Sequence, residues 1–392
     1  MGNIHNDSLI VNYPFLIMHC SKSTLLLDLF KAYKDARKHK RAKNYQLEFE
    51  LNLEENLVEL RDELFSRTYK PKPSSCFVIH DPKMREVFAA EFRDRIVHHL
   101  FYNYTHELFE RTFIEDSYSC IKNRGTHYGI KRLEHHIRSV SENYTKPCFV
   151  LKLDISGYFM SINRIRLLEI SRKTLQKMRF HQSNDEGKIW NEILDFELID
   201  YLLENIVLLN PLENCICKGG KNSWKGLAQN KSLFFAKENC GLPIGNLSSQ
   251  LFSNVYMNAL DQFVKRTLKC KHYGRYVDDS FIVSSSKTEL ENLIFPIQNF
   301  LKNELGLELH PQKTKIENAY WGVQFLGGFL LPYRNYIANS TFKRMQKKLK
   351  LLPYRTDVDV ENSLQSYLGM LSHYKNFNLL RGSDIPKSPK AL

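Results

Sequence analysis

Two adjacent carboxylates, Asp278 and Asp279, stand at the turn of a short strand–turn–strand pattern. The run 273–277 precedes them and the apolar run 281–283 follows, with serines bounding the second run as turn residues do. Two like charges side by side are electrostatically costly, and a hard divalent cation such as Mg²⁺, which prefers oxygen ligands, relieves that cost. A solvated Asp-Asp pair in an ordinary hairpin is the alternative, so the rest of the chain must decide.

A third carboxylate, Asp154, comes near the end of the mostly apolar run 148–155, which predicts a buried central strand. A sheet backed by helices can bring the end of this strand to Asp278 and Asp279, although they lie far apart in sequence. Three carboxylates so placed could hold two Mg²⁺ ions about 4 Å apart. Such ions would activate an attacking 3′-hydroxyl and neutralise a leaving pyrophosphate, because phosphoryl transfer depends mainly on positioned charge.

The chain of 392 residues carries 56 Lys and Arg against 43 Asp and Glu, a net charge of +13. This excess favours a polyanionic partner, nucleic acid first and a membrane surface second, with a generically basic protein as the alternative. No apolar run approaches the ~18 residues of a membrane span, and the polar residues of 1–16 do not fit a signal peptide. We therefore expect a cytoplasmic protein without a membrane partner, whose eight cysteines are free thiols. The C-x-C of Cys215 and Cys217 lacks the further ligands of a zinc site.

Apolar periodicity and turn residues predict the remaining elements. A polar stretch at 214–232 and its surroundings, 172–240, suggest an insertion, and no internal repeat is visible. A basic run at 31–43 is either a solvated helix face or a surface for nucleic-acid phosphates. Helices are expected over 22–70, 93–104, 188–208, 248–268, 288–304 and from 340 onward, and strands at 76–79, 85–90, 148–155, 272–284 (a hairpin) and 322–331.

The ordered series of motifs resembles a reverse transcriptase over about 85–331. Seven segments carry the resemblance: Arg85 to His98, Ser117-Tyr118-Ser119-Cys120 through Asn123-Arg124-Gly125-Thr126, Leu153-Asp154-Ile155-Ser156-Gly157-Tyr158-Phe159, Gly241-Leu242-Pro243-Ile244-Gly245-Asn246, Tyr276-Val277-Asp278-Asp279, Leu307-Glu308-Leu309-His310-Pro311-Gln312-Lys313-Thr314, and Phe325-Leu326-Gly327.

The resemblance implies an α+β, right-hand polymerase fold with fingers, a palm of antiparallel sheet plus helices, and a short helical thumb. It divides the chain into an N-terminal helical extension (1–75), fingers and palm (76–331, with the insertion at about 172–240) and a thumb (332–392). The implied activity is RNA-directed DNA synthesis with two Mg²⁺ ions and dNTPs, and the implied partners are a template RNA and a cDNA or primer.

The same resemblance assigns roles to individual residues. Phe159 would stack under the sugar and exclude a 2′-hydroxyl, and Lys313 would protonate or neutralise pyrophosphate; the alternatives are an ordinary core aromatic and a surface lysine. The metal ligands would be Asp154, Ile155, Asp278 and Asp279. The groups near dNTP or template would be Arg85, Arg95, Ser156, Gly157, Tyr158, Phe159, Ile244, Gly245, Asn246 and Gln250. The contacts to the nucleic-acid backbone would be Lys38, Arg41, Lys122, Arg124 and Lys347.

One departure narrows the family. Most reverse transcriptases carry Gln-Gly and then Ser-Pro where this chain has Ile244-Gly245-Asn246-Leu247-Ser248-Ser249-Gln250. This pattern resembles the reverse transcriptases of diversity-generating retroelements, and the stretches 214–234 and 363–373 are similar to the same group. That group implies error-prone copying at template adenines, a repeat RNA as template, and a small, basic, oligomeric accessory protein.

Because Ile244 cannot hydrogen-bond, we expect weakened base discrimination where a polar Gln usually lies. Two alternatives stay open: a retron-type or phage-defence reverse transcriptase, and a catalytically inactive RNA-binding scaffold. The presence of all three carboxylates argues against the scaffold.

Overall fold

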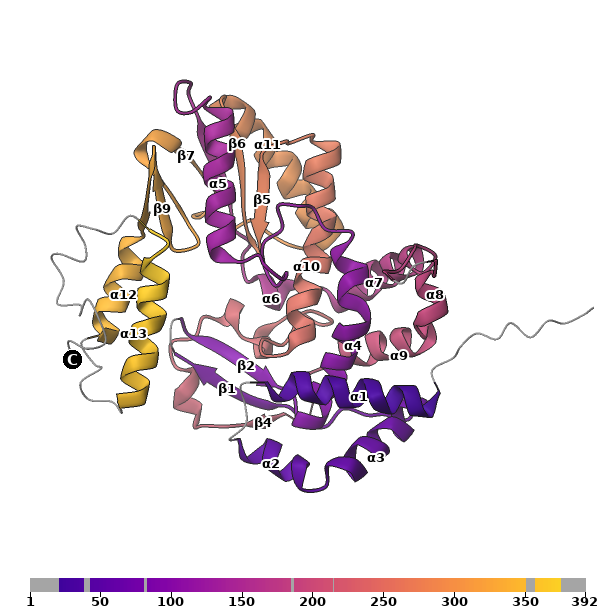
Figure 1. The fold of residues 1–392 in the computed structure, drawn as a ribbon. Coiled ribbons are helices and arrows are strands. Elements are labelled where there is room, and N and C mark those ends of the chain that lie inside the picture. Colours follow the sequence, from indigo (N-terminus) through magenta and orange to yellow (C-terminus); the bar gives the residue numbers. More distant parts are fainter. Residues whose placement is uncertain are drawn as a thin grey trace, which may run out of the picture.

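The computed structural model describes residues 21–38, 43–80, 83–184, 187–213, 215–349 and 357–374. Three helices open the described chain: α1 (Lys22–Arg37), α2 (Asn44–Leu51) and α3 (Leu53–Phe65). The Ser21 side chain caps α1 by accepting a hydrogen bond from the Thr24 N–H at 3.2 Å. The apolar face of α1 packs on α4 (Phe92–Glu110), as the helical pattern of 22–70 predicts (Figure 1).

A small sheet in the order β2-β1-β4 lies beside these helices (Figure 1). β1 (Ser75–Ile79) and β2 (Arg85–Ala89) pair antiparallel, which confirms the expected hairpin. The two-residue strand β4 (Ile216–Cys217) adds to β1 in parallel, with Ser75 opposite Ile216. This third strand was not predicted from the sequence.

The central sheet has four antiparallel strands in the order β5-β6-β3-β7. Their bounds are β3 (Phe149–Leu153), β5 (Tyr273–Tyr276), β6 (Asp279–Ser284) and β7 (Lys315–Asn318). β3 therefore lies inside the sheet, as its apolar sequence predicts. Side chains alternate between the two faces: Val150 packs in the cluster with α5 (Thr126–Val140), and Leu151 packs in the main core with α11 (Lys287–Phe300).

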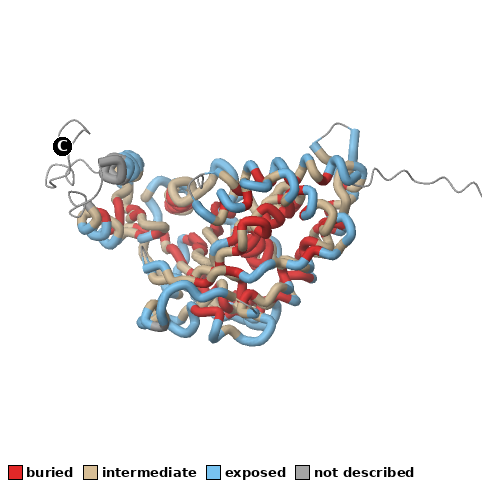
Figure 2. The backbone as a smooth tube through the Cα atoms, turned by 90° about the horizontal axis from the view of Figure 1, so that it is seen from below, coloured by how far each residue is buried: buried red, intermediate tan, exposed pale blue. Residues whose placement is uncertain are grey.

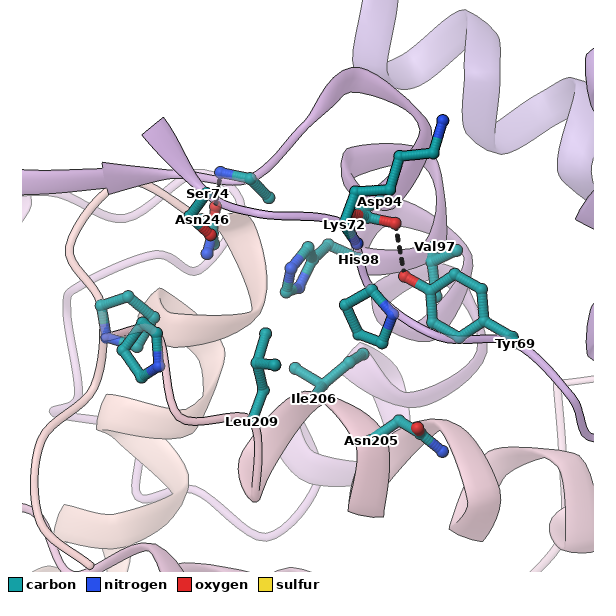
Figure 3. A pocket seen from close by; sticks show the side chains of 14 residues that line it. Tyr69, Lys72, Ser74, Asp94, Val97, His98, Asn205, Ile206, Leu209 and Asn246 are labelled. Atoms are coloured by element: carbon teal, nitrogen blue, oxygen red, sulfur yellow. Dashed lines mark hydrogen bonds between the residues drawn. The ribbon is translucent and has the colours of Figure 1, made fainter. Parts of the chain in front are cut away.

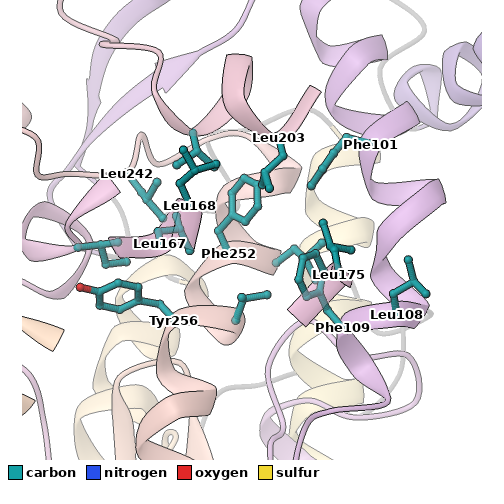
Figure 4. Packing of buried hydrophobic residues seen from close by; sticks show 14 of the residues in the cluster. Phe101, Leu108, Phe109, Leu167, Leu168, Leu175, Leu203, Leu242, Phe252 and Tyr256 are labelled. Atoms are coloured by element: carbon teal, nitrogen blue, oxygen red, sulfur yellow. The ribbon is translucent and has the colours of Figure 1, made fainter. Parts of the chain in front are cut away.

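The main core surrounds α4 and α10 (Leu247–Gln262), and buried residues fill the middle of the molecule (Figure 2). Figure 4 shows Phe101 and Phe109 of α4 and Phe252 and Tyr256 of α10 in this cluster, beside leucines from α7 (Arg164–Met178) and α9 (Phe196–Val207). The expected helix 188–208 is two helices, α8 (Trp190–Ile193) and α9, because Asp195 starts a new helix by capping the Glu197 and Leu198 N–H groups. The predicted insertion thus contributes α9 to the core.

The C-terminal part begins with a three-stranded sheet in the order β10-β9-β8. The expected single strand 322–331 is wrong: β8 (Val323–Phe325) and β9 (Gly328–Leu331) form a hairpin. Leu326 and Gly327 both have positive φ, the backbone of a two-residue hairpin turn. After β10 (Arg334–Ile337), α12 (Asn339–Leu349) and α13 (Asp357–Leu371) stand side by side at the edge of the molecule (Figure 1).

These elements make an α+β fold of the right-hand polymerase type, with the β1–β2 hairpin as fingers, the central sheet as palm and α12–α13 as thumb. The exact domain boundaries at 75 and 331 stay predictions. No helix in the described part of the chain combines the length and the apolarity that a membrane span requires.

Candidate active site

The carboxylates Asp278 and Asp279 lie at the β5–β6 turn, at one end of the central sheet. Tyr276 pairs with Asp279, so Val277 and Asp278 form the two-residue turn. Val277 has a φ of +57°, which is unusual for a β-branched residue and requires the surroundings to hold it. The carbonyl oxygen of Val277 accepts a hydrogen bond from Arg275 Nη1 at 2.8 Å. The Arg275 guanidinium therefore stabilises the turn through its backbone.

That guanidinium belongs to a fully buried ion pair. Arg275 Nη2 lies 2.6 Å from Asp261 Oδ2 and Arg275 Nε lies 2.8 Å from Asp261 Oδ1, and both side chains have no exposed surface. Tyr273 donates its hydroxyl to Asp261 at 2.7 Å, and Asn254 accepts from Arg275 at 3.2 Å. Asp261 and Asn254 come from α10, so this helix fixes the position of the catalytic turn.

The third carboxylate reaches the same end of the sheet through strand register. Leu153 of β3 pairs with Ser280 of β6, so Asp154, the next residue along, lies beside Asp279. The Asp154 carbonyl accepts a hydrogen bond from the His310 N–H at 2.7 Å, and the Ser156 N–H donates to the Glu308 carbonyl at 2.9 Å. These two hydrogen bonds hold the loop before β7 against the end of β3.

The same loop delivers Lys313 to the site. Its Nζ lies 2.6 Å from Asp154 Oδ2, and the lysine side chain is 57% exposed while that of Asp154 is 17% exposed. The structure therefore brings together all four residues expected to carry the chemistry: Asp154, Asp278, Asp279 and Lys313.

Burial and mutual repulsion disfavour the ionised forms of the active-site carboxylates. Burial, followed by the charge of Asp154, raises the pKa of Asp278 to about 6. Burial also raises the pKa of Asp279, and Lys152 opposes this rise most strongly. Carboxylates whose ionised forms are disfavoured gain most from a cation.

This donor set fits Mg²⁺ in kind, since all three side chains offer hard oxygen ligands. Ile155 is buried and bridges to Leu309, so only its backbone carbonyl could serve as a ligand. Among the described residues, no three His, Cys, Asp or Glu side chains are grouped closely enough to hold an ion as they stand. Asp154 is instead paired with Lys313.

The segment after Asp154 makes a tight bend under the site. Gly157 has a φ of +56°, and a Cβ there would lie 2.7 Å from the Asn230 carbonyl oxygen, so a side chain is excluded. Tyr158 is buried and donates its hydroxyl to the Ser253 carbonyl at 2.6 Å. The Tyr158 side chain therefore packs in the core, and the expectation that it contacts the nucleotide is wrong for this side chain. Phe159 is half-buried against the Tyr158 ring, with 5.3 Å between centroids, and its role under the sugar stays a prediction.

The loop carrying Ile244 is tied to strand β2. The Ile244 carbonyl accepts from the Phe88 N–H at 2.9 Å, and a Cβ on Gly245 would lie 2.9 Å from Val87. Asn246 is buried and its side-chain oxygen accepts a hydrogen bond from the Ala90 N–H at 3.2 Å; its expected place near dNTP or template stays a prediction. Gln250 is exposed and lies 3.4 Å from the Cys120 thiol, and its role stays a prediction.

Two arginines expected to touch substrate or nucleic acid are engaged in the protein. Arg95 donates to the Ala90 carbonyl at 2.8 Å and to the Tyr45 hydroxyl at 3.0 Å. Arg124 donates to the Glu115 carbonyl at 2.6 Å and to the Ser117 carbonyl at 2.9 Å. Both hold loops in this structure, and the expected contacts of Arg95 with dNTP or template and of Arg124 with the nucleic-acid backbone stay predictions.

The remaining expected contacts lie at the surface. Arg85, Lys122 and Lys347 are exposed. Lys38 pairs with Asp35 at 2.7 Å beyond the end of α1, and Arg41 lies outside the described residues. Burial raises the pKa of Tyr276 and the charge of Arg85 opposes this rise, so Arg85 lies near the active-site turn. The expected contacts of these cations with nucleic acid stay predictions.

Sequence reasoning missed Arg275, Asp261 and Lys152 as residues of the site. A signal for Arg275 existed, because a charged residue inside the otherwise uncharged strand 273–276 must be paired when it is buried. Nothing in the sequence singles out Asp261 as its partner from α10.

A separate cavity lies behind the Ile244 loop (Figure 3). It has about 20 Å³ of free space, room for a single water molecule. Tyr69 donates to Asp94 across one wall at 2.8 Å, and burial raises the pKa of Asp94 to about 6. The three carboxylates of the active site do not line it, and it is too small for a nucleotide.

An antiparallel sheet that presents three carboxylates between a fingers hairpin and a helical thumb defines the class of a right-hand polymerase. The family model described as reverse transcriptase (RNA-dependent DNA polymerase) matches residues 70–329. The chain belongs to the reverse transcriptase family.

Individual relatives are distant. Protein YkfC of Escherichia coli (strain K12) is 25% identical over 310 residues, which cover 70% of this chain and 71% of that protein. A putative COX1/OXI3 intron 2 protein of Saccharomyces cerevisiae is 36% identical over 63 residues, 16% of this chain and 7% of that protein. Among solved structures, apo telomerase from Candida tropicalis truncated from the C-terminal domain aligns with a TM-score of 0.47 at 13% identity, covering 68% of this chain and 56% of that one. The chain thus spans little more than half the length of that telomerase.

Proposed function

We propose that this protein is an active RNA-directed DNA polymerase that extends a primer on an RNA template with dNTPs and two Mg²⁺ ions. The convergence of Asp154, Asp278 and Asp279 at one end of the central sheet carries the proposal. The raised pKa of Asp278 supports it. Buried carboxylates whose ionised forms are disfavoured gain free energy when a divalent cation binds them.

The side chains of Asp154, Asp278 and Asp279, with the Ile155 carbonyl, would hold the ions. Bound Mg²⁺ supplies Lewis acidity to the attacking hydroxyl and the departing phosphate oxygens. The Arg275–Asp261 pair keeps the Asp278 turn in place, since it fixes the Val277 carbonyl. Lys313 is paired with Asp154 and more than half exposed, so its ammonium could turn toward and neutralise the negative charge of pyrophosphate.

A primer-extension assay on an RNA template tests the proposal. Asp278→Ala should abolish synthesis, while the exposed carboxylate variant Glu55→Ala should keep the activity of the original protein. Equal extension by Asp278→Ala and the original protein would overturn the metal assignment. Absence of extension by every form, with RNA binding retained, would favour the inactive scaffold.

We further propose that the enzyme belongs to a diversity-generating retroelement and copies template adenines with low fidelity. Ile244 supports this, because its apolar side chain packs with the cluster around Phe88 and Cys76 and offers no hydrogen bond to a base. A structured repeat RNA as template, a small basic oligomeric accessory protein as partner and a cytoplasmic site in a prokaryote or phage-infected cell complete the proposal.

Replacing Ile244 with Gln and sequencing the cDNA tests the fidelity mechanism. We expect fewer substitutions at template adenines, and an unchanged error spectrum would contradict it. The flanking DNA tests the biological setting: a near-identical repeat pair differing at adenines supports the retroelement, and a toxin gene or a structured noncoding RNA supports a retron-type or defence role.

A further inference from the structure

The segment 224–237, called here the platform segment, exposes two adjacent aromatic rings. It contains the short 3-10 turns η2 (Gln229–Lys231) and η3 (Leu233–Phe235). Leu233 is 2% exposed, yet Phe234 is 44% and Phe235 is 63% exposed. Exposing neighbouring aromatic rings to water costs hydrophobic free energy. Such a pair therefore indicates a binding surface for a partner molecule.

The platform segment is held firmly by one buried carboxylate of the fingers. Glu86 of β2 accepts hydrogen bonds from Trp224 Nε1 at 2.7 Å, Ser232 Oγ at 2.9 Å and the Leu233 N–H at 2.6 Å. Glu86 is 1% exposed, and such charge-assisted bonds are among the strong ones in proteins. The ring of Phe234 also lies 6.0 Å from that of the buried Phe88. The backbone that carries both exposed rings therefore has a fixed position.

That position is next to the active site. The Asn230 carbonyl lies against Gly157, three residues after Asp154 in the sequence. Leu233 covers Gly241 so closely that any side chain there would collide with it, and Gly241 begins the loop that carries Ile244. The platform segment thus lies against the palm bend, the Ile244 loop and the fingers.

The charge of the platform segment identifies the kind of partner. Lys225, Lys231 and Lys237 are exposed, and the segment contains no acidic residue. Single-stranded nucleic acid is recognised by aromatic rings on which bases stack and by cations that follow the phosphates. A protein partner would not require three lysines around the rings.

We propose that the platform segment binds the unpaired template strand beside the active site, with a base stacked on Phe235 and phosphates contacted by Lys225, Lys231 and Lys237. The inference rests on the proposed function for the identity of the strand. Phe234 and Glu86 act as positioning residues for Phe235.

Fluorescence anisotropy with the full chain tests the stacking. The ratio of Kd for a blunt duplex to Kd for the same duplex with a single-stranded 5′ template extension measures the contribution of unpaired bases. Phe235→Ala should reduce this ratio by about tenfold, the size of one base–aromatic stack. Phe235→Tyr, which keeps the ring, should retain it, and Phe295→Ala should leave it unchanged because Phe295 is a comparably exposed ring (70%) on α11.

Two further arms separate stacking from charge. An abasic extension keeps the phosphates and removes the bases, so the original protein should bind it as Phe235→Ala binds the normal extension. Replacing the three lysines with glutamine should reduce the slope of log K against log salt by about 2, since single strands contribute about 0.7 for each phosphate contact. An unchanged slope would remove the lysines from the interface.

The proposal is overturned if Phe235→Ala matches the original protein on the normal extension, or if the abasic extension binds as well as the normal one. Primer extension is measured in parallel. Synthesis without any effect of Phe235 would reject the platform alone, whereas an effect of Phe235 on binding without synthesis would reject the polymerase activity alone.

Discussion

At the scale of single residues, Lys313 is paired with an oxygen of Asp154 that the proposed metal ions would need. The Nζ–Oδ2 distance of 2.6 Å shows a close ion pair, and the lysine is more than half exposed. A side chain so exposed can turn away into water at small cost, because surface ion pairs contribute about 0–1 kcal/mol. The pair therefore orients the Asp154 side chain in the metal-free protein and could open at small cost for the proposed metal ions.

Lys313→Gln should separate metal binding from catalysis. Without the competing ammonium, we expect Mg²⁺ to bind the free enzyme several-fold more tightly, as measured by calorimetry. The rate of the chemical step should fall by about a hundredfold, the lower end for loss of a group that transfers a proton or neutralises charge. Unchanged Mg²⁺ affinity would show that the ion pair with Asp154 does not oppose the metal.

Asp278 should make the metal-free protein less stable as pH rises. Its folded pKa of about 6 lies above the unfolded value, so its contribution to stability is fully present below about pH 4 and is lost as pH rises through 6. In EDTA at pH 7, Asp278→Asn should be more stable than the original protein by on the order of 3 kcal/mol.

Urea unfolding between pH 4 and pH 8 measures this difference. It should approach zero near pH 4, and saturating Mg²⁺ at pH 7 should stabilise the original protein more than Asp278→Asn. A difference that does not change with pH would contradict the raised pKa.

At the scale of elements, α10 and the β5–β6 hairpin form one unit through Arg275 and Asp261. A buried pair with both side chains fully enclosed is costly to break, because the remaining charge has no partner. The pair also fixes the Val277 carbonyl, so stability and catalytic geometry depend on the same contact.

A double-mutant cycle tests this unit. Arg275→Met and Asp261→Leu should each lower the free energy of unfolding by about 3–5 kcal/mol, and the double variant should lose less than the sum. Primer extension should remain impaired in the double variant, since nothing then holds the Val277 turn. Additive losses in urea unfolding, or full activity of the double variant, would contradict the coupling.

The elements that the sequence predicted are those with strong local patterns. The β1–β2 hairpin, β3 and the β5–β6 turn follow from apolar runs bounded by turn residues. The break before α9 and the hairpin at Leu326 were missed, because an apolar run does not reveal where a cap or a positive φ interrupts it.

The same limit applies to the site. Asp154, Asp278 and Asp279 could be predicted to meet because each lies at or next to the end of a strand of one sheet. The contacts of Asn246, Arg95 and Arg124 with backbone groups could not, because they depend on loops whose paths only the folded chain defines.

At the scale of the whole molecule, the thumb has little hydrophobic support of its own. Among the described residues its separate cluster has three buried members, Ile337, Met345 and Leu371. It meets the palm where the rings of His127 and His373 stack at 3.8 Å. Regions with so few buried contacts open more readily than the main core.

Met345→Ala should loosen the thumb and leave the palm intact. We expect faster hydrogen exchange of amides in α12 and α13, because a cavity in so small a cluster costs about 2–5 kcal/mol locally. Exchange in β3 should not change, and Lys347→Ala on the exposed side of α12 serves as the control. Equal acceleration in β3 would show that thumb and palm unfold together.

The parallel pairing of β4 with β1 has a consequence for how the protein is made. Ser75 leaves the ribosome long before Ile216, so β1 spends much of synthesis with one unpaired edge. An open edge of the apolar strand Ser75–Ile79 is a template for association with other chains. Chains that terminate before Ile216 keep this edge unpaired at Ser75 and Cys76, and we expect them to associate more readily than the full chain.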